Sequence, residues 1–267
     1  WHLRHGFKAD SQLADGTTLL GLASAAGNGE VVKCLVNTGA DVNLKDKSGR
    51  VPLHFALQHA AVMVVLLDGG ANPNLPDPSG AMPLHLACRA TQPDTVAVLL
   101  SHGADPLAKA RDGKTPMQWA GDWKDEAASI VVSLMEKGAP LQEEGLLPLQ
   151  RLKGDAIPTF VIPSVGPWLT DKNASNRYKA AWILSNAGPR ARATLDQLVL
   201  CLTNESDLKV LRYVSLSVGE IGPDAQSAVP HLLRILEKRP LYSTVAQGQA
   251  YIRNELATES SAPMGRH

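Results

Sequence analysis

The chain has 267 residues, enough for one large domain or two of ordinary size. Hydrophobic residues make up 44% and charged residues 19%, a composition that excludes an intrinsically disordered chain. Lysine plus arginine equals aspartate plus glutamate at 26 each, so the basic surplus that general nucleic-acid binders use against phosphate is absent. The longest apolar runs, such as residues 62–67, are too short to span a bilayer. We therefore expect no membrane span and disfavour nucleic acid as a partner.

Aromatic residues and cysteines are few. With 5 Trp, 4 Tyr and 3 Phe, small aliphatic side chains must form most of the interior, as closely stacked helices require. Cys34, Cys88 and Cys201 lie far apart in apolar stretches, and none belongs to a Cys-x-x-Cys pair. We interpret them as reduced core residues, which fits a cytoplasmic protein.

Two sequence marks recur in phase through the first half of the chain. The first is a turn followed by a helix start, at residues 16–23, 49–56, 80–87 and 113–120. The second is a Gly-Ala pair at Gly39, Gly70, Gly103 and Gly138, with spacings of 31, 33 and 35 residues. Pro52, Pro83 and Pro116 suit the first turn of a helix, where the missing N–H has no intrahelical partner. The glycine of each pair is expected to end a second helix in the left-handed conformation. Each unit is thus predicted to be a helical hairpin that stacks on its neighbours.

These marks resemble the Thr-Pro-Leu-His and Gly-Ala-Asp-Val-Asn signatures of the ankyrin repeat, over about residues 1–142. The resemblance implies a truncated first unit followed by four repeats. The second repeat is two residues short around residues 58–60, and the fourth is two residues longer, with Gln118 in the place of histidine. Residues 3–7 are similar to the end of a second helix, so residues 1–5 are expected to be helical and the chain to be part of something longer.

A second self-similarity follows a Pro- and Gly-containing connection at residues 143–160. Residues 162–169, 195–202 and 229–236 align with one another, and the stretches between them end in Gly-Pro pairs at Gly188 and Gly222, 34 residues apart. Glycine ends a helix and proline cannot continue it, so this spacing predicts paired helices. In the connection, Leu146, Leu147 and Leu149 are expected to be buried.

The second pattern resembles the short HEAT-like repeat of phycobilin lyases and bacterial scaffolds, over about residues 156–257. Arg177 matches an arginine of that family, whereas Leu211 takes its place in the next unit. The resemblance implies HEAT-like repeats at residues 161–257, with a C-terminal cap at residues 245–256, and a tail at residues 258–267. The predicted fold class is all-α, an α-solenoid in which ankyrin repeats are stacked onto or joined to short HEAT-like repeats.

The sequence contains no recognisable catalytic pattern. Residues 113–115 read Gly-Lys-Thr, but the earlier glycine of a phosphate loop is missing. There is no nucleophile elbow, paired-carboxylate motif or His-Glu pair of the kind that HEAT-repeat iron hydroxylases use. His54 and His85 occupy the ankyrin histidine position, which braces turns in that family. We expect a non-enzymatic protein with no catalytic residues, no metal ligands and no cofactor.

The ankyrin resemblance implies a protein partner bound on the concave side, which the turn tips and the ends of the first helices form. The matching positions here are Lys47, Arg50, Gln58, His59, Arg89, Arg111, Asp112, Lys114, Asp122 and Trp123. Trp123 is the expected anchor, because Trp and Arg dominate binding energy at interfaces. Trp119, four residues earlier, is expected to lie mostly in the core.

The sequence predicts a scaffold that binds a protein on its concave repeat surfaces. Two alternatives stay open. One is a HEAT-like module that handles a chromophore or nucleic acid, with the ankyrin repeats as a targeting arm. The other is the regulatory region of a larger enzyme.

Overall fold

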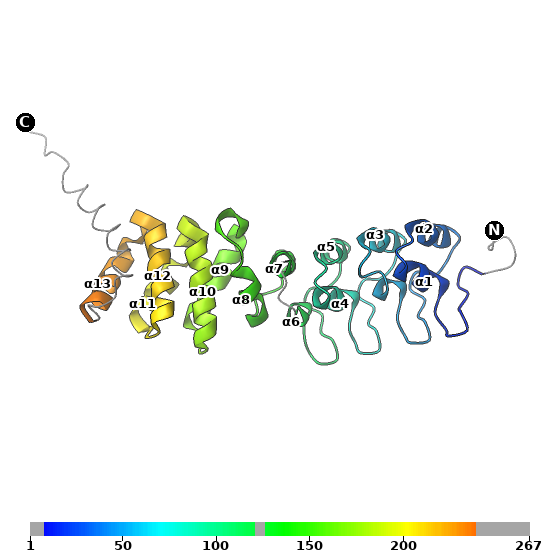
Figure 1. The fold of residues 1–267 in the computed structure, drawn as a ribbon, viewed down its shortest axis with the longest axis horizontal. Coiled ribbons are helices and arrows are strands. Elements are labelled where there is room, and N and C mark those ends of the chain that lie inside the picture. Colours follow the sequence, from blue (N-terminus) through cyan, green and yellow to red (C-terminus); the bar gives the residue numbers. More distant parts are fainter. Residues whose placement is uncertain (1–7, 121–125, 239–267) are drawn as a thin grey trace, which may run out of the picture. The chain divides into compact units, whose positions relative to one another are not determined.

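The computed structural model describes residues 8–120 and 126–238, and the chain divides into two compact units, Trp1–Pro148 and Leu149–His267. Every regular element of the described residues is a helix, apart from one isolated bridge between Gln12 and Thr18 (Figure 1). The all-α solenoid fold class predicted from the repeats is confirmed. No helix in the described ranges is long and apolar enough to cross a membrane.

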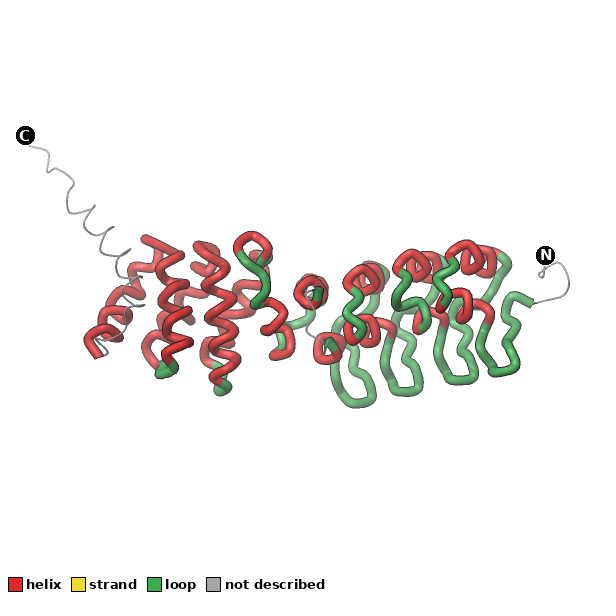
Figure 2. The backbone as a smooth tube through the Cα atoms, viewed as in Figure 1, coloured by secondary structure: helices red, strands yellow, loops and turns green. Residues whose placement is uncertain are grey.

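Unit 1 is a stack of helical hairpins in two layers. The first helices are α1 Leu19–Ala25, η2 Pro52–His54, α4 Pro83–Arg89 and α6 Pro116–Trp119, and each contacts the next. The second helices are α2 Gly29–Asn37, α3 Ala60–Asp68, α5 Pro93–Ser101 and α7 Ala127–Glu136, which also pack in order. The long turns between repeats project beyond the layer of first helices (Figure 2).

Local chemistry explains why these hairpins form. Pro52, Pro83 and Pro116 begin their helices as predicted. Gly39, Gly70, Gly103 and Gly138 follow the second helices with φ between 83° and 94°, a region that favours glycine.

Two buried histidines join neighbouring repeats. His54 Nδ1 accepts a hydrogen bond from the N–H of Val51 at 3.1 Å, and its Nε2 lies 3.3 Å from the carbonyl oxygen of Ala81 in the next repeat. His85 repeats the pattern, with Nε2 3.1 Å from the carbonyl oxygen of Lys114. Each ring therefore braces its own turn and the following one, as the ankyrin resemblance implied.

The repeats of unusual length have short first helices. The second repeat, two residues short, has only the 3₁₀ turn Pro52–His54 before α3 begins at Ala60. The fourth has the four-residue α6, in which Gln118 replaces histidine and accepts the N–H of Thr115 through Oε1 at 3.1 Å. An amide oxygen thus serves the local role of the histidine Nδ1.

Unit 2 consists of paired helices joined by 3₁₀ turns. Its elements are η3 Gly154–Ala156, η4 Thr159–Val161, α9 Ile162–Val165, η5 Gly166–Thr170, α10 Ala174–Ala187, η6 Gly188–Thr194, α11 Leu195–Asn204, α12 Leu208–Ile221, η7 Gly222–Ala228 and α13 Val229–Lys238. The long helices α10 and α12 pack side by side (Figure 1). Gly188 and Gly222 end them with nearly the same backbone angles, φ 61° and ψ −141° against φ 73° and ψ −142°. This repeated geometry matches the 34-residue period of the sequence.

The connection expected at residues 143–160 is more regular than its Pro and Gly content suggested. It contains α8 Glu143–Leu149, which holds Pro148, and the turns η3 and η4. Leu146 and Leu149 are buried as expected, whereas Leu147 is partly exposed. The expectations for residues 1–5, for a cap at residues 245–256 and for a tail at residues 258–267 fall outside the described residues.

Candidate partner-binding surface

One position of each first helix leaves an apolar side chain partly uncovered. Leu22, Phe55, Leu86 and Trp119 occupy the same place in the four repeats, one residue before the small buried alanine of the motif. Leu22 is 49% exposed, and the other three are partly exposed. Since the first helices contact each other in order, these side chains form a row along one layer of unit 1, here called the apolar row.

Two arginines lie over the rings of the apolar row. The Arg50 guanidinium is 4.3 Å from the centre of the Phe55 ring, and that of Arg89 is 5.0 Å from the centre of the Trp119 ring. Arg50 is also held by Asp46 at 3.7 Å and by the Ser48 hydroxyl at 2.9 Å. Both arginines are exposed, so they combine a cation–π contact with a charge available to a partner.

Trp119, expected to lie mostly in the core, is partly buried. Its indole N–H donates to the Asp112 carboxylate at 3.2 Å, and its ring meets the ring of His85 edge-on, with centres 5.4 Å apart. Met117, two residues earlier, fills the core instead. The pKa of Asp112 lies below its usual range, because its carboxylate accepts hydrogen bonds from the backbone N–H of Lys114 and, with a smaller effect, from the Trp119 indole. Trp119 is therefore held in place, and a partner can contact its partly exposed ring without ordering it first.

The remaining predicted site residues lie around this row. Three of them are exposed near the turn tips, namely Lys47, Arg111 and Lys114. The backbone N–H of Lys47 donates to the carbonyl oxygen of Gly16, and that of Arg111 donates to the carbonyl oxygen of Ser79. Gln58 and His59 lie in the turn before α3. The structure thus brings Arg50, Arg89 and Asp112 into contact with the rings of the apolar row, whereas the other five line the turns. Asp122 and Trp123 fall outside the described residues.

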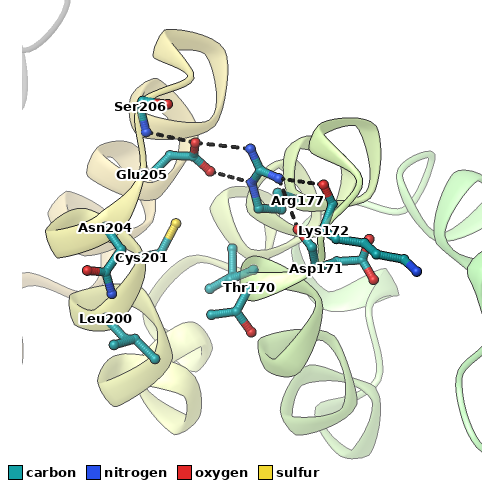
Figure 3. A pocket seen from close by; sticks show the side chains of 10 residues that line it. Thr170, Asp171, Lys172, Arg177, Leu200, Cys201, Asn204, Glu205 and Ser206 are labelled. Carbon is teal, nitrogen blue, oxygen red and sulfur yellow. Dashed lines mark hydrogen bonds and ion pairs between the residues drawn. The ribbon is translucent and has the colours of Figure 1, made fainter.

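One hollow of unit 2 is built around an ion pair. It measures about 380 Å³ and lies beside Arg177 of α10 and Glu205, which follows α11 (Figure 3). Arg177 Nε and Nη2 donate to the two carboxylate oxygens at 2.6 and 3.2 Å, while its Nη1 donates to the carbonyl oxygens of Asp171 and Lys172. The N–H groups of Ser206 and Asp207 donate to the carboxylate at 2.8 Å.

This arrangement leaves neither charge free for chemistry. Burial raises the pKa of Glu205, but the hydrogen bonds from Arg177, Asp207 and Ser206 outweigh it and hold that pKa below its usual range. The pair instead ties the start of α10 to the turn after α11, and we name it the Arg177–Glu205 clamp. The expected arginine is thus placed in a structural role.

Metal-binding and thiol chemistry find no support in the described residues. Over residues 8–120 and 126–238, no group of three His, Cys, Asp or Glu side chains is placed to hold a metal ion. Burial raises the pKa of the Cys88 thiol far above its usual range and that of Cys201 to about 12. The prediction that all three cysteines are core residues is wrong for Cys34, which is exposed on α2 between the buried Val32 and Leu35.

The comparisons with known proteins identify the family. A model of ankyrin repeats in three copies matches residues 1–77 and 59–144, over half of the chain. The chain belongs to the ankyrin-repeat family. A 50-residue segment of this ankyrin-repeat chain is 42% identical to rabankyrin-5 of Homo sapiens, and equally to that of Mus musculus. The segment covers 19% of this chain and 4% of either relative, so the chain matches only a small part of these relatives' length.

Proposed function

We propose that this ankyrin-repeat chain is a non-enzymatic, cytoplasmic scaffold that binds a protein partner along the apolar row of unit 1. The observation that carries the proposal is the row itself. Four partly uncovered apolar side chains occupy equivalent positions in consecutive repeats, and two exposed arginines lie over the rings of Phe55 and Trp119. Exposed apolar surface of this kind, rimmed by charge, marks interaction sites in soluble proteins.

The composition of the row supports protein recognition. Trp and Arg are enriched among the residues that dominate interface energetics, and both are already held in place here. A side chain that is ordered before binding loses less conformational entropy when the complex forms. Lys47, Arg111 and Lys114 at the turn tips add positive charge, which favours a partner that carries acidic groups beside its apolar side chains.

We further propose that unit 2 is a HEAT-like extension of the scaffold. Three features support this interpretation: the helical pairs, the matching ends of α10 and α12 at Gly188 and Gly222, and the Arg177–Glu205 clamp between the start of α10 and the end of α11. A solenoid unit of this kind stacks through nearest-neighbour contacts. Its role is then to offer a second surface to partners.

The test compares variants of the full chain in binding to a purified partner obtained by affinity capture. Arg89→Ala combined with Trp119→Ala should raise the Kd at least about tenfold, because the pair forms the most ordered part of the row. Lys33→Ala, an exposed residue of α2 in the other helical layer, is the matched control and should leave the Kd unchanged. Equal affinity of the double variant and the wild type would refute the assignment of the row.

A further inference from the structure

Three aromatic rings gather on the neighbouring helices α10 and α12 of unit 2. The ring centres of Trp182 and Tyr213 are 4.7 Å apart, those of Tyr178 and Tyr213 are 5.5 Å apart, and those of Tyr178 and Trp182 are 6.2 Å apart. The Trp182 indole N–H donates to the carbonyl oxygen of Gln150 at 3.2 Å, which fixes that ring. All three side chains are only partly buried. The cluster is therefore a rigid aromatic surface that remains accessible.

A hollow of about 490 Å³ opens beside two of these rings. Tyr178 and Tyr213 form its aromatic side, and Lys209 and Arg212 of α12 line it together with Ser175. Lys209 and Arg212 are exposed, and neither forms an ion pair within the described ranges.

The carboxylate that also lines the hollow is already in use. Asp207 precedes α12 and accepts the N–H groups of Lys209 and Val210 at 2.8 and 3.4 Å. One of its oxygens thus caps the start of the helix. Among the described residues, two cations face this hollow without an acidic partner, in contrast to the Arg177–Glu205 clamp, where cation and carboxylate are matched.

We propose that the aromatic hollow of α10 and α12 binds a short acidic segment of a protein partner. Carboxylates of the segment pair with Arg212 and Lys209, and an adjoining apolar side chain packs against Tyr178 and Tyr213. A guanidinium can hold a carboxylate through two parallel hydrogen bonds, which gives this contact direction as well as charge. The hollow has room for one or two side chains, so a short segment is sufficient.

The ring geometry favours a peptide over a single-stranded nucleic acid. Base stacking needs an open ring face, but the planes of Tyr178 and Tyr213 meet at 78° and the Arg212 guanidinium lies 5.8 Å above the Tyr213 ring. Burial, followed by the charge of and a hydrogen bond with Tyr178, raises the pKa of Tyr213, so its hydroxyl stays neutral at neutral pH and does not repel a carboxylate.

The experiment measures the fluorescence anisotropy of labelled probes titrated with the full chain. The first probe is a peptide of about twelve residues with alternating Asp, Glu and Gly around one central Phe. The second has Asn and Gln in place of Asp and Glu, and the third is oligo-dT of similar length. We expect the acidic peptide to bind at least about tenfold more tightly than its amide counterpart, and more tightly than oligo-dT.

Two matched variants locate the binding. Arg212→Gln should weaken binding of the acidic peptide about tenfold, whereas Arg234→Gln, at another exposed arginine on α13, should not. Equal binding of both peptides, no binding below about 1 mM, or equal effects of the two variants would overturn the proposal. Tighter binding of oligo-dT that depends on Arg212 would reassign the hollow to nucleic acid. Self-association that Arg212→Gln abolishes would reassign it to a second copy of the chain. Variants of the apolar row should leave peptide binding intact, so this test is separate from that of the proposed function.

Discussion

The Arg177–Glu205 clamp makes the most quantitative prediction for this protein. Arg177→Ala removes the guanidinium that donates to the Glu205 carboxylate, and the side chain of Glu205 is 4% exposed. The side chain of Arg177 is itself only 20% exposed. Loss of one partner leaves a largely buried charge without its counter-ion, and such changes cost about 3–5 kcal/mol. Two backbone N–H groups still donate to the carboxylate, so we expect the lower end, about 3 kcal/mol.

The second partner and the double variant separate charge from packing. Glu205→Gln keeps the shape of the side chain and leaves Arg177 bonded to two carbonyl oxygens, so its cost should be smaller, about 1–2 kcal/mol. The double variant Arg177→Ala with Glu205→Gln removes the ionic interaction as a whole. It should be less destabilised than the sum of the single changes, because no unpaired charge stays buried.

Urea unfolding of the full chain, followed by circular dichroism and by hydrogen exchange of peptides from α10 and α12, measures these effects. The exchange data assign the loss to unit 2, since a chain with two units need not unfold in one transition. The folded pKa of Glu205 lies below its unfolded value of about 4.3, so its contribution is present above that pH and is lost as the pH falls through the folded pKa. The difference between wild type and Glu205→Gln should therefore shrink on acidification. If Arg177→Ala costs less than about 1 kcal/mol at neutral pH, or if the difference persists in acid, the clamp is not the ionic structure inferred here.

Three further outcomes follow from individual residues. Gly188→Ala should destabilise unit 2 by about 1–3 kcal/mol through backbone strain alone, because an added Cβ meets no atom within 4 Å; Gly219→Ala inside α12 should be neutral or stabilising in the same urea titration. Burial lowers the pKa of His54, so the folded state resists protonation, and the melting temperature of unit 1 should drop as the pH falls below about 6.5; His54→Gln should reduce this dependence, and an unchanged slope would contradict it. Trp119→Ala should lower the free energy of unfolding by about 1–2 kcal/mol in thermal melts, less than the loss at a fully buried tryptophan. A loss above about 3 kcal/mol would show that this side chain belongs to the core.

The repeats could be predicted because their residues act locally. A proline in a first turn or a glycine after a second helix fixes the backbone whatever lies around it. Pro83 and Gly103 therefore mark helix ends correctly, and the spacing between such marks predicts the stacked hairpins. The same reasoning predicts the ends of α10 and α12 at Gly188 and Gly222.

Side-chain environments were harder to predict, because they depend on which way a helix faces. Trp119 was expected mostly in the core because it stands where the ankyrin repeat usually has Leu, yet its alignment with Leu22, which is 49% exposed, indicates a partly exposed position. Cys34 belongs to an apolar stretch, but it lies on the exposed side of α2. The connection at residues 143–160 looked irregular because proline and glycine mark turns, whereas Pro148 lies inside α8 and Pro158 lies at the N-cap of η4.

A one-residue difference between repeats of unit 2 separates a structural arginine from a binding one. Arg177 and Leu211 occupy the same place in successive repeats of unit 2, and Leu211 is 5% exposed. The arginine of the second repeat is instead Arg212, one residue further along α12. Adjacent positions of an α-helix lie about 100° apart around its axis. That rotation takes the guanidinium away from the place where the Arg177–Glu205 clamp forms and brings it over the Tyr213 ring at the aromatic hollow, where no carboxylate of the described residues pairs with it. The second repeat of unit 2 thus keeps an apolar contact where the first repeat has an ion pair. The arginine of the second repeat remains available to a partner.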